Sequence, residues 1–137
     1  MALSKQEIDE LLSKEEVCFT ATVKKGGSPH IAPIWFLYVD GKIYFETDTT
    51  TVKYKNIQRK NAVAICFGGK DTLIIEGSVK DYGTEENAPI PFRKLFREKY
   101  KEAYDDSYIN EKTHIFEVIP KKQMTWHYEI GEKYFPD

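Results

Sequence analysis

The sequence has too few cysteines for a disulfide framework and no apolar stretch long enough to span a membrane as a helix. Its 137 residues include two cysteines, Cys18 and Cys66, and neither has the Cys or His neighbours of a zinc site or a redox pair. No segment approaches the ~18 apolar residues of a spanning helix, and the N-terminus becomes polar at once. We therefore expect a cytoplasmic protein that makes no use of a membrane.

An excess of charge of one sign is also missing. The 20 Lys and Arg residues nearly balance the 22 Asp and Glu residues, which leaves a net charge of −2. General electrostatic binding of nucleic acid is therefore not expected. Aromatic residues reach 14%, a composition that suits strands or a pocket for a planar ligand. The length predicts one domain over residues 1–137.

Several motifs that would identify an enzyme class are absent. The sequence contains no Gly-x-Ser-x-Gly elbow, no Walker loop and no Gly-x-Gly-x-x-Gly fingerprint. The histidines His30, His114 and His127 do not stand three or four residues from another His or a Cys, so no metal site is expected. Both cysteines have apolar neighbours, which disfavours an activated thiol. The catalytic residues, if there are any, stay unassigned.

Short segments of strand character, separated by glycine-bearing turns, dominate the chain. Their apolar patterns predict strands at 17–23, 29–39, 42–47, 62–67, 72–82, 113–119 and 123–128. Helical spacing and capping residues predict helices at 4–14, 52–60 and 91–104. This clustering favours a mainly β protein, an antiparallel barrel with short peripheral helices, over an alternating parallel sheet.

A hydroxyl-rich loop that leads into a basic helix is the most informative feature. Thr47 and Thr49–Thr51 precede Lys53–Lys60, a segment with four cations and no anion. Free backbone N–H groups, the helix dipole and an ammonium in the first turn all favour a bound phosphate. The alternative interpretation is a solvated helix face with ordinary caps.

The strand expected before this loop favours a planar ligand. It is apolar on both faces, and Pro33 interrupts its ladder because proline has no N–H. Backbone groups freed near Trp35 can hydrogen-bond the edge of a heterocycle while side chains cover its face. Asp40-Gly41 is a short hairpin signal that brings Thr47 back towards the start of the same strand. A ring slot beside a phosphate site is what flavin mononucleotide (FMN) requires.

Four segments stand in an order and spacing that are found in a known family. They are Ala21–Val23, Gly27–Phe36, Asp40–Thr47 and Thr51–Ile57. Together they resemble the pyridoxamine 5'-phosphate oxidase-like, FMN-binding split-barrel superfamily. The resemblance covers residues 17–67 well and the remainder of the chain in strand order only.

The resemblance implies a six-stranded antiparallel split barrel (Greek key) that forms a homodimer with FMN at the subunit interface. It also implies an FMN-dependent oxidoreductase that transfers hydride or electrons to a small-molecule substrate. The cofactor-binding residues that it implies are Pro33, Ile34 and Trp35 for the isoalloxazine ring, Thr47, Thr51 and Lys53 for the phosphate with Asn56 nearby, and Trp126 for the partner's site.

The resemblance leaves the substrate and the exact cofactor open. Trp126 is followed by His127-Tyr128-Glu129, without the arginines that pyridoxine phosphate oxidases carry for their phosphorylated substrate, so oxidation of vitamin B6 is not expected. Relatives also bind a deazaflavin or haem, and both are alternatives to FMN. A rival class is a non-enzymatic module, either a cofactor carrier or a barrel that binds single-stranded nucleic acid through aromatic residues and the basic helix. The net charge speaks against nucleic acid.

Overall fold

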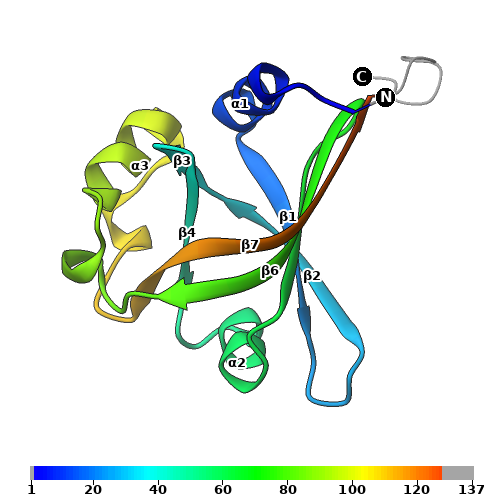
Figure 1. The fold of residues 1–137 in the computed structure, drawn as a ribbon. Helices are drawn as coiled ribbons and strands as arrows, with labels where there is room; N and C mark the ends of the chain where they lie inside the picture. The colour runs from blue at the N-terminus through cyan, green and yellow to red at the C-terminus, as the bar shows by residue number, and fades with distance from the viewer. Residues whose placement is uncertain (1, 128–137) are drawn as a thin grey trace.

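The computed structural model describes residues 2–127, which form a strongly curled antiparallel sheet with helices around it (Figure 1). The strands are β1 (Val17–Val23), β2 (Pro29–Trp35), β3 (Leu37–Val39), β4 (Lys42–Asp48), β5 (Val63–Gly68), β6 (Asp71–Asp81) and β7 (Thr113–His127). The helices are α1 (Lys5–Lys14), α2 (Val52–Arg59) and α3 (Phe92–Tyr100), with 3₁₀ turns η1 (Glu85–Asn87), η2 (Lys101–Ala103) and η3 (Asp106–Tyr108). The expected mainly β, antiparallel barrel-like fold is confirmed.

The chain itself joins the two edges of the sheet, and this connection requires the sheet to curl. The strand order is β2-β1-β5-β6-β7-β4-β3, so β2 and β3 are opposite edges, yet only Phe36 separates them along the chain. β2 accordingly comes close to β4. The interior is filled by fully buried side chains, among them Phe36, Phe45, Phe67 and Phe116. Burial of this apolar surface is the main force that holds the barrel together.

The strand expected over residues 29–39 is divided at Phe36, which differs from the sequence prediction. The Phe36 N–H donates to the Tyr100 hydroxyl (2.9 Å), and the Phe36 carbonyl accepts from the Lys99 ammonium (2.8 Å). Both backbone groups of Phe36 therefore bond side chains of α3 rather than a neighbouring strand. A pattern read along residues 29–39 cannot reveal a partner that is 64 positions away.

Two further differences concern β7 and α3. The strands expected at 113–119 and 123–128 form one strand, β7, which pairs with β6 across a bulge at Glu76/Gly77; residue 128 lies outside the described residues. The sheet has seven strands, whereas the resemblance implies six. The helix expected to reach residue 104 ends at Tyr100, because Lys101 adopts a left-handed backbone with φ of 47°.

Local capping explains where α1 and α2 begin. Ser4 and Glu7 form a reciprocal capping box, in which each side chain accepts the other residue's N–H at 3.1 and 2.9 Å. The Thr51 hydroxyl accepts the Tyr54 N–H at 3.2 Å and so caps α2. Both starts agree with the sequence prediction.

A second apolar cluster lies between α3 and the sheet. Phe92, Phe96 and Tyr100 are buried on one face of α3, at helical spacing. The Trp35 ring stacks on Tyr100, with ring centroids 4.0 Å apart and planes 4° apart. α3 is thereby attached to the end of β2, the strand that leads into the candidate site.

Candidate functional site

A cavity of about 680 Å³ lies where the end of β2, the end of β4 and the first turn of α2 meet. The volume falls within the roughly 300–1,000 Å³ of small-molecule sites. Six of the eight residues expected to bind the cofactor line it. The lining residues are Val17, Pro33, Ile34, Trp35, Glu46, Thr47, Asp48, Thr51, Lys53, Ala103 and Tyr108.

The β2 side of the cavity offers a backbone edge. Within residues 2–127, β2 pairs with β1 alone, so its other edge takes no part in the sheet ladder. Pro33 lies at this edge strand, where proline is tolerated because no neighbour needs its N–H. The Trp35 side chain is fixed against Tyr100, which holds this part of the strand in place. A flat ligand along β2 therefore meets backbone polar groups in fixed positions.

The opposite side is the hydroxyl-rich loop and the start of α2. Thr47 is buried on β4, and the Thr51 hydroxyl caps α2 while donating to the Asp48 carbonyl at 2.9 Å. The Thr50 N–H and hydroxyl both donate to the Asp48 carboxylate, at 2.8 and 2.7 Å. Lys53 follows in the first turn of α2, half-buried at the cavity wall. The loop is thus rigidly folded around a helix N-terminus with a cation beside it, a combination suited to an anion.

Three ionisable side chains line the cavity, and their surroundings shift their pKa values in different directions. Burial, opposed by the nearby Lys53 ammonium, raises the pKa of Glu46 to about 7. Burial also lowers the pKa of Lys53, against the opposing influence of Glu46. The two hydrogen bonds from Thr50 lower the pKa of Asp48, so its carboxylate stays charged. The cavity therefore contains one carboxyl that changes its charge near neutral pH.

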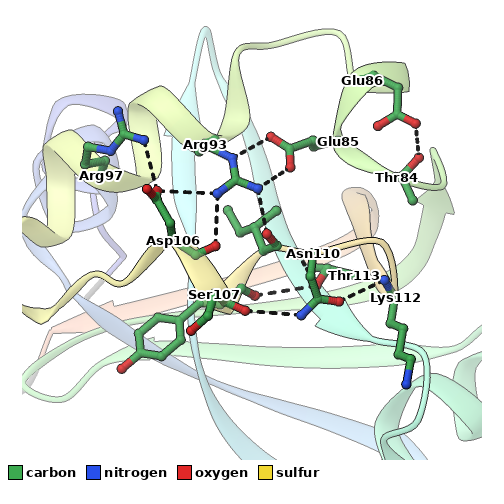
Figure 2. A network of polar contacts seen from close by, with 12 residues as sticks. Thr84, Glu85, Glu86, Arg93, Arg97, Asp106, Ser107, Asn110, Lys112 and Thr113 are labelled. Atoms are coloured by element: carbon green, nitrogen blue, oxygen red, sulfur yellow. Dashed lines mark hydrogen bonds and ion pairs between the residues drawn. The ribbon is translucent and has the colours of Figure 1, made fainter.

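The third wall comes from the segment between α3 and β7. Tyr108 and Ala103 reach the cavity from η3 and η2. Figure 2 shows how this segment is held: Arg93 bonds both Glu85 and Asp106, at 2.5 Å to the Glu85 Oε2 and 3.4 Å to the Asp106 Oδ1. Arg93 also donates to the Ile109 carbonyl at 2.6 Å. These contacts fix the backbone on both sides of Tyr108.

Two expected site residues do not line this cavity. Asn56 is buried, donates to the Thr22 hydroxyl at 3.0 Å and accepts from Arg59, so its amide joins α2 to β1. Trp126 lies near the end of β7, in register with Thr72 of β6. The roles predicted for Asn56 and Trp126 therefore stay predictions.

Thiol and metal chemistry find no support in the described part of the chain. Burial raises the pKa of Cys18 to about 12 and also raises that of Cys66, so neither thiol is activated. Across residues 2–127, no three His, Cys, Asp or Glu side chains are placed to hold a metal ion. His114 and His127 instead contact Asp81 and Asp71. No described helix is both long enough and apolar enough to cross a bilayer.

The lining residues that sequence reasoning missed are Val17, Glu46, Asp48, Ala103 and Tyr108. The sequence places Glu46 directly after the apolar residues Ile43–Phe45 and directly before Thr47, and nothing in that pattern indicates that its side chain lines a cavity. No sequence signal marks Tyr108, which stands 55 positions after Lys53, the last lining residue of the β2–α2 region. Only the packing of the segment after α3 places it there.

Comparisons with known proteins agree with the geometry. The model of the family described as "Pyridoxamine 5'-phosphate oxidase" matches residues 4–127. No protein with a curated description matches the sequence.

Solved structures share the fold at low sequence identity. A conserved hypothetical protein from Mycobacterium tuberculosis, Rv2991, is 19% identical with a TM-score of 0.77, over 100% of this chain and 91% of that chain. A protein described as an F420 reductase is 24% identical with a TM-score of 0.66, over 84% and 94% of the two chains. HutZ of Vibrio cholerae, described as a heme storage protein, is 15% identical with a TM-score of 0.73, over 93% and 98%. At such identities the likeness concerns the fold.

Proposed function

The chain belongs to the pyridoxamine 5'-phosphate oxidase family, and from this premise we propose that its cavity binds FMN. The bound flavin would supply hydride or electron transfer, and the protein would bind it, orient it and tune its charge. The substrate would be a small molecule that reaches the flavin beside Tyr108 and Ala103. The protein would then act as an FMN-dependent oxidoreductase.

The observation that carries the proposal is that one cavity has a strand edge on one side and a helix N-terminus with a cation on the other. Pro33–Trp35 supply a strand edge that no other described strand pairs with, which suits a ring. Thr47, Thr51 and Lys53 supply a helix start and a cation, which suit a phosphate. A flavin mononucleotide has a flat polar-edged ring at one end and a phosphate at the other. The strand edge therefore suits the ring, and the helix start with Lys53 suits the phosphate.

An apolar row on the outer face of the sheet, exposed at Phe19 and Pro33, supports the proposed homodimer. Phe19 of β1 is exposed and pairs with the exposed Pro33 on one side and Cys66 on the other. The same row continues through Ile74 to Met124, so it crosses five strands on the outer face of the sheet. Apolar rows of this extent mark interaction surfaces. Pro33 belongs both to this row and to the cavity, so a second copy seated here would also cover the ring slot.

The position of Trp126 is compatible with a role across such an interface. It stands two residues after Met124 on β7, and side chains two apart on a strand point to the same face. Trp126 therefore extends the apolar row on the proposed interface. We propose that it contacts the flavin of the partner subunit.

The direct test is to identify what the purified protein carries. We expect flavin absorbance near ~450 nm, and release of a mass equal to FMN on denaturation, because the proposal names FMN as the resident cofactor. Colourless protein that takes up neither FMN nor riboflavin on titration would contradict the proposal.

A deazaflavin and haem are the two alternatives to FMN, and the absorbance and mass of the bound cofactor distinguish the three. A deazaflavin would fit the same ring slot and would give a shifted absorbance. Haem requires an axial His, Cys, Met or Tyr ligand, and Tyr108 is the only described lining residue of these types. The cavity therefore supports FMN or a deazaflavin better than haem. Non-enzymatic carriage of the flavin would appear as bound cofactor that no reductant or substrate turns over.

A further inference from the structure

The charge of the cavity conflicts with the ligand proposed for it. Two carboxyl groups, Glu46 and Asp48, and one ammonium, Lys53, line the wall where the phosphate is placed. With all three ionised the wall carries an excess negative charge. A phosphate ester has a second pKa of about 6 and is largely dianionic at neutral pH. Binding it beside two carboxylates would bring like charges together in a partly desolvated space, which is unfavourable.

Protonation of either carboxyl group would reduce this repulsion, but the two groups differ in how readily they accept a proton. Asp48 accepts two hydrogen bonds from Thr50 and lies near Lys112, and both features favour its charged form. Glu46 lies on β4 opposite the fully buried Ile115 of β7, and its half-buried carboxyl lines the cavity, so part of its hydration is lost. Desolvation already opposes its charge, so neutralising Glu46 requires the least change in free energy.

We infer that Glu46 takes up one proton from solvent when the cavity binds the phosphate of its ligand. The inference rests on the proposed function and deepens it. The proton converts the carboxylate to a neutral carboxylic acid, so the Lys53 ammonium faces the phosphate without a competing charge on Glu46. Glu46 thus makes binding of a phosphate-bearing ligand dependent on pH, whereas binding of the ring alone is not.

The groups that face Glu46 set the direction of this dependence. They are Lys53 of α2 and Asp48 of β4, which act on it directly, and Tyr44 of β4 and Glu117 of β7, which share its face of the sheet. Tyr108 lines the same cavity, and Cys18 of β1 acts on Lys53. The thiol of Cys18 is protonated at neutral pH, since burial raises its pKa to about 12. Because the pKa of Glu46 is about 7 without ligand, Glu46 is mostly ionised at pH 7.5–8.5. Affinity for FMN should therefore fall as the pH rises through this range, by up to about tenfold per pH unit for one linked proton.

The experiment is calorimetric titration of the full-length protein with FMN and with riboflavin at pH 7.5, 8.0 and 8.5. Each titration is repeated in two buffers of different ionisation enthalpy, so that the proton uptake is measured directly. The FMN phosphate is already dianionic in this range, and riboflavin carries no phosphate. We expect wild-type protein to take up a substantial fraction of a proton with FMN and none with riboflavin. Glu46→Gln should abolish the uptake and flatten the pH dependence of FMN affinity.

Two further variants separate Glu46 from its neighbours. Glu111→Gln removes an equal charge from an exposed carboxyl outside the cavity and should leave the uptake unchanged. Lys53→Arg keeps a cation that does not titrate in this range and should keep the uptake. Uptake that persists in Glu46→Gln but disappears in Lys53→Arg would assign the proton to Lys53 and overturn the inference. FMN binding without any proton uptake would overturn the inference alone, and no FMN binding at any pH would overturn the proposed function with it.

Discussion

The Tyr100 hydroxyl lies 2.9 Å from the backbone nitrogen of Phe36 and accepts its N–H, while the Tyr100 ring stacks on Trp35. The Tyr100 side chain of α3 thus holds in place both Phe36, which divides β2 from β3, and Trp35, the last cavity-lining residue of β2. The same hydroxyl donates to the Glu16 carbonyl at 2.7 Å, just before β1. Tyr100 is therefore the point at which α3, β1 and the β2–β3 junction are joined.

Replacement of Tyr100 by Phe should destabilise the fold while preserving the stack on Trp35. The change leaves the Phe36 N–H and the Glu16 carbonyl without this partner, and a buried backbone group without its hydrogen bond costs about 1–3 kcal/mol. Urea unfolding measures the loss. Tyr108→Phe is the control, because that side chain is exposed, and it should change the free energy of unfolding by less than about 0.5 kcal/mol. Equal effects of the two variants would contradict the role of the Tyr100 hydroxyl.

Replacement of Lys53 by Ala should weaken FMN binding and barely affect riboflavin. A charge-assisted hydrogen bond to the phosphate is worth about 1.5–3 kcal/mol, or roughly 10- to 150-fold in Kd. Lys60 is exposed at the opposite end of α2, so Lys60→Ala should leave both affinities nearly unchanged. Titration of both variants with both ligands at constant salt decides the matter. If Lys53→Ala weakens FMN and riboflavin equally, Lys53 supports the fold or the ring rather than the phosphate.

A charge at Phe19 should separate the proposed dimer. Phe19 of the apolar row is 47% exposed, and Phe19→Asp would place a carboxylate inside the proposed interface. Sedimentation or light scattering should then report a monomer with reduced flavin affinity, because the ring slot loses its cover. Phe19→Leu keeps an apolar contact and should remain dimeric. A wild-type monomer that binds flavin tightly would refute the interface.

Trp126 should quench the fluorescence of the partner's flavin. We expect Trp126→Phe to raise the emission of the bound flavin and to weaken cofactor binding by about 0.5–1.5 kcal/mol, the scale of an aromatic pair beyond its burial. Emission spectra and a titration of the variant provide both values. Unchanged quenching together with unchanged affinity would restrict Trp126 to a structural role on β7.

Glu46 should also make the stability of the ligand-free protein depend on pH. Its folded pKa of about 7 lies above the ordinary value of 4.5, so the folded state binds more protons than the unfolded state between these values. Stability contributed by the neutral carboxyl is therefore present at low pH and is lost as the pH rises towards 7. Glu46→Gln should be more stable than wild type at pH 8 by about 1–3 kcal/mol, and the difference should shrink at pH 5. Denaturant unfolding at both pH values tests this, and parallel pH profiles for the two proteins would contradict it.

The sequence by itself determined the local features of this protein. Ser4 and Glu7 specify a helix start, and Thr51 specifies another, because caps involve groups only three residues apart. Asp40 and Gly41 adopt positive φ at the hairpin that the sequence indicates. That Thr47, Thr51 and Lys53 lie at one cavity was predictable for the same reason, since they stand within one short segment.

Only the tertiary structure decided where the long strand is interrupted, which distant residues line the cavity and how its carboxyl groups ionise. Phe36 leaves the sheet because its backbone groups bond Tyr100 and Lys99, and no pattern near residue 36 records that bond. Tyr108 forms part of the cavity because Arg93 holds the segment around it. Glu46 is an ordinary carboxylate in the sequence, and burial at the cavity wall of the folded chain raises its pKa to about 7. Hydrogen bonds between residues far apart in the sequence, and the loss of water around a side chain, arise only in the packed chain. They explain why the predicted phosphate loop forms one wall of a cavity and why a carboxyl group of that cavity has a raised pKa.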